Sequence, residues 1–358
     1  MRPALLCQRR FSTALYLGTY SMGCVLPFLA TCVWLKVAGV FPQFWFWTIS
    51  YAREYAAILP FAQGSTYLFA MLARAIETSL LLCLGAAFGL ALLCSVRMTL
   101  GRRLFLLGFL AFSVLSVCPG YYFRPHYFIL LLPAVALLIG LAVAWSEEWF
   151  EPTPWLRLAP LIIAVVACAT SLLAYHNILF KLSPDAAVGA VYPDRPFAES
   201  LDIARYIQEH TTPGDRIAVI GSEPEIYFYA HRRSSTGYIY TYPLVEPQPF
   251  AKKMLAEMIG EIERNPPAYL VFVSVPSSLS SARYYQGEAR RSLVAWVHDY
   301  TAKNMHAVGW IRLTGPGASE AVWLSEAAGT SPQSSSYIAI YESRQHHSTA
   351  TAAGGNRD

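Results

Sequence analysis

The distribution of charge along the chain is the feature that most constrains its fold. Residues 1–180 contain 11 Lys and Arg and only 5 Asp and Glu, whereas residues 181–358 contain 16 and 18. A soluble domain needs a solvated surface and carries about 25% charged residues, so the first half does not have the composition of one. We therefore expect a membrane half followed by a water-soluble half. The net charge of +4 gives no basic footprint for a nucleic acid.

Apolar windows in the first half predict the membrane spans. A spanning helix needs about 20 mostly apolar residues. Five windows reach or approach this length: 14–40, 78–96, 104–118, 127–145 and 155–175. The third and fourth windows are separated only by Pro119–His126, so we expect them to form a helical hairpin.

Positive charge predicts how these spans are oriented. Lys and Arg are retained in short cytoplasmic loops. If five spans alternate, one side of the membrane receives Arg2, Arg9, Arg10, Arg97, Arg102, Arg103 and Arg157. We take that side as the cytoplasm, which places the soluble half on the outer side. The outer loop 41–77 begins with aromatic residues typical of an interfacial belt, and Tyr55–Ala73 is expected to form an interfacial helix.

The second half alternates between helical and strand patterns. Helices are predicted over 197–210, 223–230, 249–265 and 288–304, and strands over 216–220, 268–273, 305–313, 321–324 and 337–341. This alternation predicts a small α/β domain with a mostly parallel sheet over 181–343, followed by a disordered tail over 344–358. Gly221-Ser222-Glu223 follows the first strand, a place where ligands can bind. We interpret it as a structural turn, because no nucleotide-binding motif surrounds it.

The cysteine pattern does not indicate a metal site. All seven cysteines lie in the first half, most of them inside apolar windows. Neither paired cysteines nor a Cys/His cluster occurs at the spacing of a zinc site. We expect no metal and no cofactor, and the catalytic residues stay unknown.

The hairpin turn contains the best candidate site. Arg124 and His126 lie beside Tyr122, and arginine can bind phosphate oxygens through two hydrogen bonds. A lipid phosphate would lie at this depth, with Lys36 at the outer end of the first span as a further phosphate contact. The alternative is that Arg124 and Lys36 snorkel to lipid headgroups and that His126 is a capping residue.

A second cluster of basic residues lies in the soluble half. His231, Arg232 and Arg233 are consecutive, so they could meet an anionic acceptor on its way to the membrane. The alternative is an ordinary solvated loop.

Two stretches of the chain resemble one family. Gly120–Ala134, with the sequence GYYFRPHYFILLLPA, is similar to the late outer turn of polyprenol-dependent glycosyltransferases. These are relatives of the dolichyl-phosphate-mannose protein mannosyltransferases, glycosyltransferase family 39. The stretches 215–230 and 237–243 are similar to the outer domain of bacterial members. The resemblance implies a C-type glycosyltransferase fold in the bacterial inner (cytoplasmic) membrane, with membrane lipids around it. Its donor would be a polyprenyl-phosphate-linked sugar and its role protein glycosylation in the cell envelope.

The resemblance covers only the C-terminal part of that family's architecture. Family members have more spans upstream and a general base among acidic residues of their first outer loop, where this chain has only Glu54 and Glu77. We therefore expect this chain to be the C-terminal portion of such an enzyme, with an N-terminal partner segment that supplies the missing spans. Whether the chain is active without that segment stays open. The alternative is a non-catalytic membrane-anchored subunit that binds a glycan or a protein.

Overall fold

The structure is a computed structural model that forms two compact units, residues 1–59 and 60–358. It describes residues 3–95, 98–149, 153, 156, 158–193, 195–279, 287–315, 318–323 and 336–346. Arg2, Arg97, Trp155, Arg157 and Leu324, on which parts of the predictions rest, lie outside the described residues, as does 347–358 of the predicted tail.

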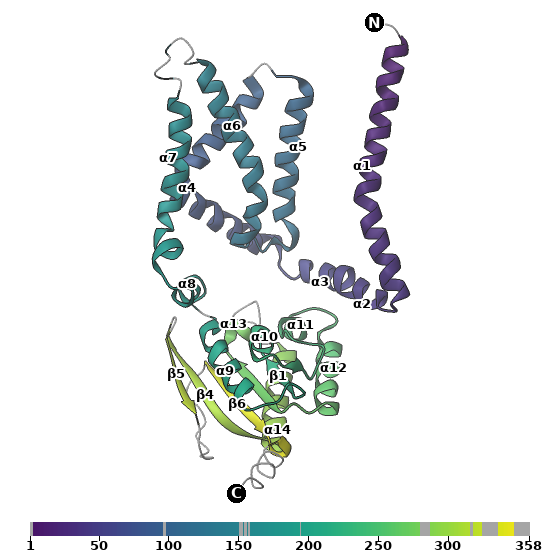
Figure 1. The fold of residues 1–358 in the computed structure, drawn as a ribbon, viewed down its shortest axis with the longest axis vertical. Coiled ribbons are helices and arrows are strands. Elements are labelled where there is room, and N and C mark those ends of the chain that lie inside the picture. Colours follow the sequence, from purple (N-terminus) through teal and green to yellow (C-terminus); the bar gives the residue numbers. More distant parts are fainter. Residues whose placement is uncertain are drawn as a thin grey trace. The chain divides into compact units, whose positions relative to one another are not determined.

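The described part of the first unit consists of helices joined by short connections. Its helices are α1 (Pro3–Val37), α2 (Phe41–Trp45), the π-helix η1 (Phe46–Tyr51) and α3 (Ala52–Ala57) (Figure 1). From Thr13 onward α1 is apolar and exposes its large hydrophobic side chains on all sides, as expected of a helix surrounded by lipid. The aromatic residues that follow contact one another, with ring centroids 5.9 Å apart in Phe41–Trp45 and 5.3 Å apart in Trp47–Tyr51.

Within the described residues, four helices are long and apolar enough to cross a membrane. They are Thr13–Val37, Phe61–Cys94, Leu100–Val117 and Pro125–Trp149, so the chain has the architecture of a membrane protein. The fifth predicted span corresponds to α7 (Ala159–Ala174), an apolar helix of 16 residues. Such a helix is about 24 Å long, shorter than a hydrocarbon core of about 30 Å. The π-helix η4 (Asn177–Lys181) follows it.

The membrane helices of the second unit pack closely. They are α4 (Phe61–Ser95), α5 (Leu100–Val117) and α6 (Leu132–Trp149), together with α7. Ser79 has non-helical dihedral angles, and α4 bends (Figure 1). This break falls at the start of the predicted span 78–96. Further along α4, Gly89 faces the backbone of α6, where an added Cβ would lie 2.0 Å from the Leu138 carbonyl oxygen.

The predicted hairpin is confirmed. The 3₁₀ helices η2 (Pro119–Tyr121) and η3 (Pro125–Leu131) join α5 to α6, and α5 packs on both η3 and α6. The turn is therefore held at the end of two apolar helices.

The remaining elements form an α/β domain. Its helices are α8 (Pro184–Val191), α9 (Phe197–Glu209), α10 (Glu225–Ala230), α11 (Tyr242–Val245), α12 (Ala251–Arg264), α13 (Pro276–Leu279) and α14 (Glu288–Asn304). Its strands are β1 (Arg216–Ile220), β2 (Arg233–Ser234), β3 (Tyr269–Ser274), β4 (Met305–Gly315), β5 (Ala318–Trp323) and β6 (Tyr337–Ser343), arranged in the order β2-β1-β3-β6-β4-β5. Arg344–His346, expected in the tail, form a helical turn after β6.

The sheet is mixed, so the prediction of a mostly parallel sheet was wrong. β1 pairs in parallel with β2 and β3, whereas the pairs β3–β6, β4–β6 and β4–β5 are antiparallel. A parallel pair needs a crossover of a dozen or more residues. Only residues 316–317 separate β4 from β5, too few for a crossover, which forces these two strands to run antiparallel.

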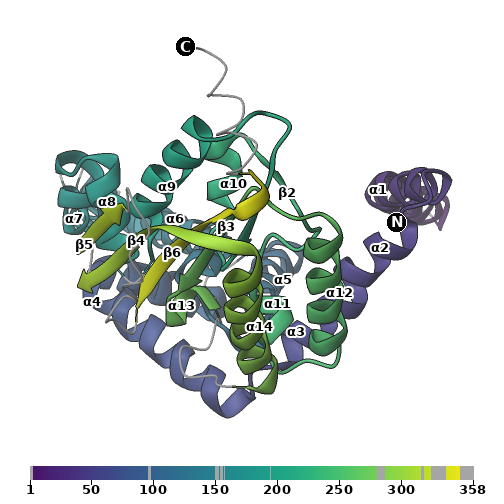
Figure 2. The ribbon, with the colours of Figure 1, turned by 90° about the horizontal axis from the view of Figure 1, so that it is seen from below.

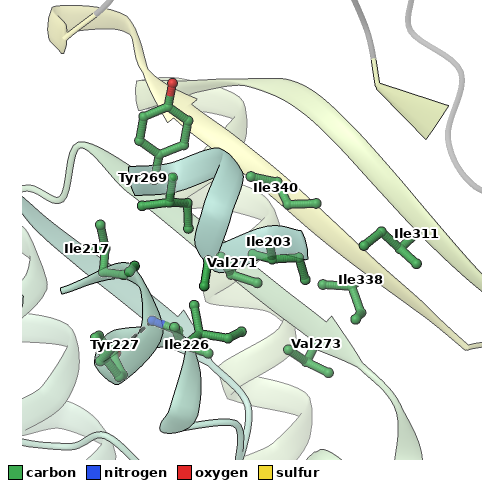
Figure 3. Close-up of a cluster of buried hydrophobic side chains, with 14 of the residues drawn as sticks. Ile203, Ile217, Ile226, Tyr227, Tyr269, Val271, Val273, Ile311, Ile338 and Ile340 are labelled. Atoms are coloured by element: carbon green, nitrogen blue, oxygen red, sulfur yellow. Dashed lines mark hydrogen bonds between the residues drawn. The ribbon is translucent and has the colours of Figure 1, made fainter. Parts of the chain in front are cut away.

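Helices cover both faces of the parallel part of the sheet. Figure 2 shows α9 and α10 on one face and α12 and α14 on the other. Figure 3 shows the core on the first face, where Ile203 and Ile226 meet alternate residues of the strands, including Ile217, Val271 and Ile338. Ala218, Leu270 and Phe272 are buried as well. Because β1 and β3 are covered on both sides, their sequences are continuous apolar runs.

We predict that Gly89→Ala destabilises the protein by about 1–3 kcal/mol, the usual cost of overpacking. The new methyl group would meet the α6 backbone, which cannot give way as a flexible side chain can. The matched control is Gly108→Ala in α5, where nothing lies within 4 Å of an added Cβ. That change should be neutral or slightly stabilising, since alanine favours a helix. Thermal unfolding in detergent measures both, and equal midpoints would contradict the prediction.

Candidate functional site

The hairpin turn has an unusual backbone. Gly120, Tyr121 and Phe123 have φ angles of 73°, 55° and 41°. A positive φ is ordinary for glycine, but for a bulky residue it costs on the order of 1–3 kcal/mol and persists only where the surroundings impose it. Strain of this kind concentrates at functional sites.

The start of α4 provides the surroundings that hold this turn. A Cβ at Gly64 would lie 2.4 Å from the Tyr121 Cβ, so the missing side chain lets the turn approach the helix. The rings of Phe61 and Tyr121 meet edge to face at 5.5 Å. Phe123 is buried, and its ring lies 6.5 Å from that of Phe128. These contacts fix the backbone that leads into Arg124.

The turn brings Arg124, Tyr122 and His126 together. The guanidinium carbon of Arg124 lies 5.1 Å from the ring centroid of Tyr122, a cation–π geometry. Arg124 is half-buried, while His126 is exposed in the first turn of η3 and its ring lies 4.7 Å from that of Tyr127. Lys36 is in the last turn of α1, within the other unit, so its grouping with Arg124 stays a prediction.

The Arg232 guanidinium group is hydrogen-bonded within the α/β domain. It is buried, and its guanidinium group donates to the Thr211 hydroxyl and to four backbone carbonyl groups: those of Gln208, Thr211, Ala230 and His231. Its charge is therefore engaged by protein groups and does not face an acceptor. We do not retain it as an acceptor-side residue.

The two exposed members of that cluster lie at the amino end of β1. His231 ends α10 with a left-handed backbone, and Arg233 pairs with Arg216 at the start of the parallel strands. A strand of five residues is about 17 Å long. The basic pair is therefore separated by the length of β1 from the groups at the carboxyl end of that strand.

The carboxyl end of β1 holds a buried carboxylate that sequence reasoning interpreted as part of a structural turn. Glu223 is only 1% exposed. Its Oε2 atom accepts hydrogen bonds from the Ser222 N–H at 2.7 Å and from the Ser278 hydroxyl at 2.6 Å. Among the described residues, neither Glu223 Oε1 nor the Ser222 hydroxyl has a hydrogen-bond partner.

Gly221 makes room for this carboxylate. A Cβ at this position would lie 2.3 Å from Glu223 Oε2 and 2.9 Å from the Ser278 hydroxyl. The carbonyl group of Gly221 also accepts hydrogen bonds from both the backbone N–H and the hydroxyl of Thr241. The turn after β1 is thus tied to α13 and to the segment before α11.

The surroundings hold Glu223 as a weak acid. Burial raises its pKa to about 7, an effect that the Ser278 hydrogen bond opposes. The negative charge of Glu225 raises this pKa further, whereas the Ser222 N–H and the positive charge of Arg195 lower it. Burial also raises the pKa of Glu225. Carboxyl groups with such shifts are concentrated at functional sites.

Two tyrosines lie within electrostatic reach of the carboxylate and of two cations. The ring centroids of Tyr240 and Tyr242 lie 4.7 Å apart, and the Arg195 guanidinium carbon lies 5.7 Å from the Tyr242 ring centroid. Burial and then Tyr242 raise the pKa of Tyr240, whereas the positive charges of Arg195 and Arg124 lower it. Both guanidinium groups therefore act on the Tyr240 hydroxyl. We call Arg124, Arg195, Glu223, Tyr240 and Tyr242 the acid–arginine cluster.

The sequence does contain a signal for this cluster. Polar residues follow both parallel strands that the apolar runs predicted: Ser222 and Glu223 after β1, and Ser277 and Ser278 after β3. Carboxyl ends of neighbouring parallel strands lie at the same edge of a sheet, where ligands bind in α/β proteins.

Comparison of the chain with protein-family models, curated proteins and solved structures gives no match. Within the described residues, no group of three His, Cys, Asp or Glu side chains could hold a metal ion. The chemistry of the site therefore has to be argued from its own side chains.

We predict that Glu223 makes the stability of the protein fall as the pH rises from about 4.5 to about 7. Its pKa is raised from 4.5 to about 7 on folding, so ionisation is easier in the unfolded chain. The contribution of Glu223 to the free energy of unfolding is complete below pH 4.5. It falls by about 3 kcal/mol as the pH rises above 7. Glu223→Gln cannot ionise and should therefore gain stability relative to the native protein between pH 5 and pH 8. Thermal unfolding of the variant and of the native protein at pH 5 and at pH 8 measures this gain in stability.

The matched control is Glu209→Gln, which changes an exposed carboxyl group in the same domain. Its stability relative to the native protein should be the same at both pH values. A Glu223→Gln difference that does not vary with pH would contradict the prediction.

Proposed function

We propose that this chain is part of a membrane glycosyltransferase that takes a sugar from a polyprenyl phosphate. The observation that carries this proposal is the position of Arg124. It follows a strained turn between two apolar helices, and its charge acts on a tyrosine of the α/β domain. A ligand at Arg124 would therefore lie at the end of two apolar helices, within electrostatic reach of Tyr240.

The phosphate of a lipid-linked sugar fits the cationic side. Arginine binds phosphate oxygens in a bidentate manner, and it stays charged when partly buried. The Tyr122 ring lies 5.1 Å from the Arg124 guanidinium carbon and so helps to orient this group. In transfer, Arg124 would stabilise the charge that develops on the departing phosphate, and His126 would donate a hydrogen bond to it.

The tyrosines fit the sugar. Tyr240 is 38% exposed and Tyr242 is buried beside it, so Tyr240 presents an aromatic face and a hydroxyl next to the cations. Aromatic rings with a polar tip suit ligands that are apolar on one face and hydrogen-bonding at their edges, as sugars are. Arg195 adds a second positive charge close by.

The proposal also includes a location and an orientation. We place the chain in the bacterial inner membrane with the α/β domain on the outer side, as positive charge in the cytoplasmic loops favours. This topology requires α7 to cross the membrane. With η4 the helical segment extends from Ala159 to Lys181, long enough for a crossing.

A second candidate function is a non-catalytic subunit that binds a glycan or a protein. It is favoured by Phe228 and Tyr229 of α10, which are 72% and 44% exposed. Exposed aromatic residues of this kind mark binding surfaces. This second function requires neither a lipid-phosphate site nor turnover of a donor, whereas the glycosyltransferase requires both.

Arg124→Ala should weaken binding of undecaprenyl phosphate to the full chain in nanodiscs at least tenfold, or about 1.4 kcal/mol. Undecaprenol, which lacks the phosphate, should bind the native protein and the variant equally. The matched control is Arg102→Ala, at the opposite end of α5, which should keep native affinity. Equal affinity of the native protein for undecaprenyl phosphate and undecaprenol would contradict the proposal, as would native affinity in Arg124→Ala.

We predict that a reporter fused after Leu182 shows an outer location in bacterial cells. Alkaline phosphatase fused there should be active, because it folds only outside the cytoplasm, and green fluorescent protein should be dark. The same pair fused within the loop that contains Arg97 should give the opposite result. Phosphatase activity confined to the latter fusion would overturn the orientation.

A further inference from the structure

The membrane half of the chain is poor in groups that could take a proton. It contains five acidic residues in its first 180 positions. Glycosyl transfer to a hydroxyl group needs an acceptor for that proton, and a carboxylate is the usual one. The acid–arginine cluster contains a carboxylate that the proposed function has not used.

The geometry around Glu223 leaves one oxygen of the buried carboxyl group without a hydrogen-bond partner among the described residues. Two donors, the Ser222 N–H and the Ser278 hydroxyl, hold Oε2. Oε1 has no partner among the described residues, and its residue is 1% exposed. A buried carboxyl group that is fixed at one oxygen and unpartnered at the other is oriented to exchange a proton with a single ligand group.

The room for this carboxylate comes from a specific residue. Gly221 has no side chain, and a Cβ at this position would lie only 2.3 Å from Glu223 Oε2. The Ser222 N–H and the Ser278 hydroxyl of α13 donate hydrogen bonds to Oε2, and Thr241 donates to the carbonyl group of Gly221.

Two charged groups act on Glu223, and they come from different parts of the chain. Glu225 at the start of α10 disfavours its negative charge, and Arg195 before α9 favours it. Tyr242 of α11 in turn responds to the charges of both Arg195 and Glu223. Arg195 also acts on Tyr240, as does Arg124. The carboxylate acts on Tyr242 and the cation that would hold the phosphate acts on Tyr240, and these two rings lie 4.7 Å apart.

We propose that Glu223 is the general base of the transfer reaction and accepts the proton of the acceptor hydroxyl group at Oε1. This inference rests on the proposed function. The acceptor oxygen forms a bond to the anomeric carbon, and the bond from that carbon to the phosphate oxygen breaks. Its electron pair leaves with the lipid phosphate, and the acceptor's proton passes to Glu223. The products are the glycosylated acceptor, the polyprenyl phosphate and a protonated Glu223, which then loses its proton to water.

The burial of Glu223 adds a structural requirement. The segment that leads into α11 is bound to the turn, because the backbone N–H and the hydroxyl of Thr241 both donate to the carbonyl group of Gly221. The segment must move aside when the acceptor hydroxyl group enters. Tyr240, which precedes it and is partly exposed, would contact the entering sugar.

The test measures release of undecaprenyl phosphate by the full chain in liposomes. The donors are undecaprenyl-phosphate-linked mannose, glucose and arabinose, and a bacterial envelope extract supplies acceptors. Glu223→Gln should lower kcat at least 100-fold while the donor KM and the binding of undecaprenyl phosphate stay within twofold of native. Glu223→Asp should restore part of kcat, and Glu209→Gln should be native. In the native protein kcat should rise with pH through about 7, following the ionisation of Glu223.

The outcomes separate the two proposals. Native turnover in Glu223→Gln would overturn the proposal that Glu223 is the general base. Equal losses of kcat in Glu223→Gln and Glu223→Asp with an unchanged pH profile would also overturn it, because they indicate a structural role. A native protein that binds undecaprenyl phosphate but releases none from any of the donors would also overturn the base and leave the lipid-phosphate site standing. Failure of the native protein to bind undecaprenyl phosphate would overturn the proposed function itself.

Discussion

The burial of the Glu223 carboxyl group is the constraint that determines the structure at the carboxyl end of β1. Removing a carboxyl group from water is costly, and the cost is tolerable only with good hydrogen bonds or a bound proton. Here the protein uses both, because two donors hold Oε2 while the pKa rises to about 7. The absence of a side chain at Gly221 and the position of Ser278 follow from that requirement.

The membrane helices obey a different constraint and produce the other half of the site. In lipid, backbone groups must be satisfied within the helices, so irregular backbone is confined to the ends or to protein-covered places. The turn between α5 and α6 is such a place. Its strained residues Tyr121 and Phe123 are held by Gly64 and by burial, and they deliver Arg124 at the end of two apolar helices. In the proposed function Arg124 binds the lipid phosphate, and Glu223 of the α/β domain acts on the sugar acceptor.

Most of the local structure could be predicted because it depends on short-range patterns. The apolar runs of β1 and β3, the four-residue spacing that predicted α12 and the hairpin of α5 and α6 all reflect burial of side chains close in sequence. The parallel sheet was overpredicted because the pattern identifies strands without their partners. The two-residue connection of β4 to β5 was the local feature that favoured an antiparallel pair. The 16-residue length of α7 likewise became clear only once its start at Ala159 was defined.

The sequence by itself determined that the chain has a membrane half and an α/β half, since charge density and apolar periodicity are properties of single segments. It also identified Arg124, Tyr122 and His126, which lie on one turn and so are near one another in any fold. Only the tertiary structure decided that Glu223 is buried and has a raised pKa. It also decided that the Arg232 guanidinium group donates hydrogen bonds to backbone carbonyl groups. Both outcomes depend on residues 20 or more positions away, Ser278 for the first and Gln208 and Thr211 for the second. Desolvation and hydrogen bonding are set by what packs around a group, and that is known only when the distant segments are in place.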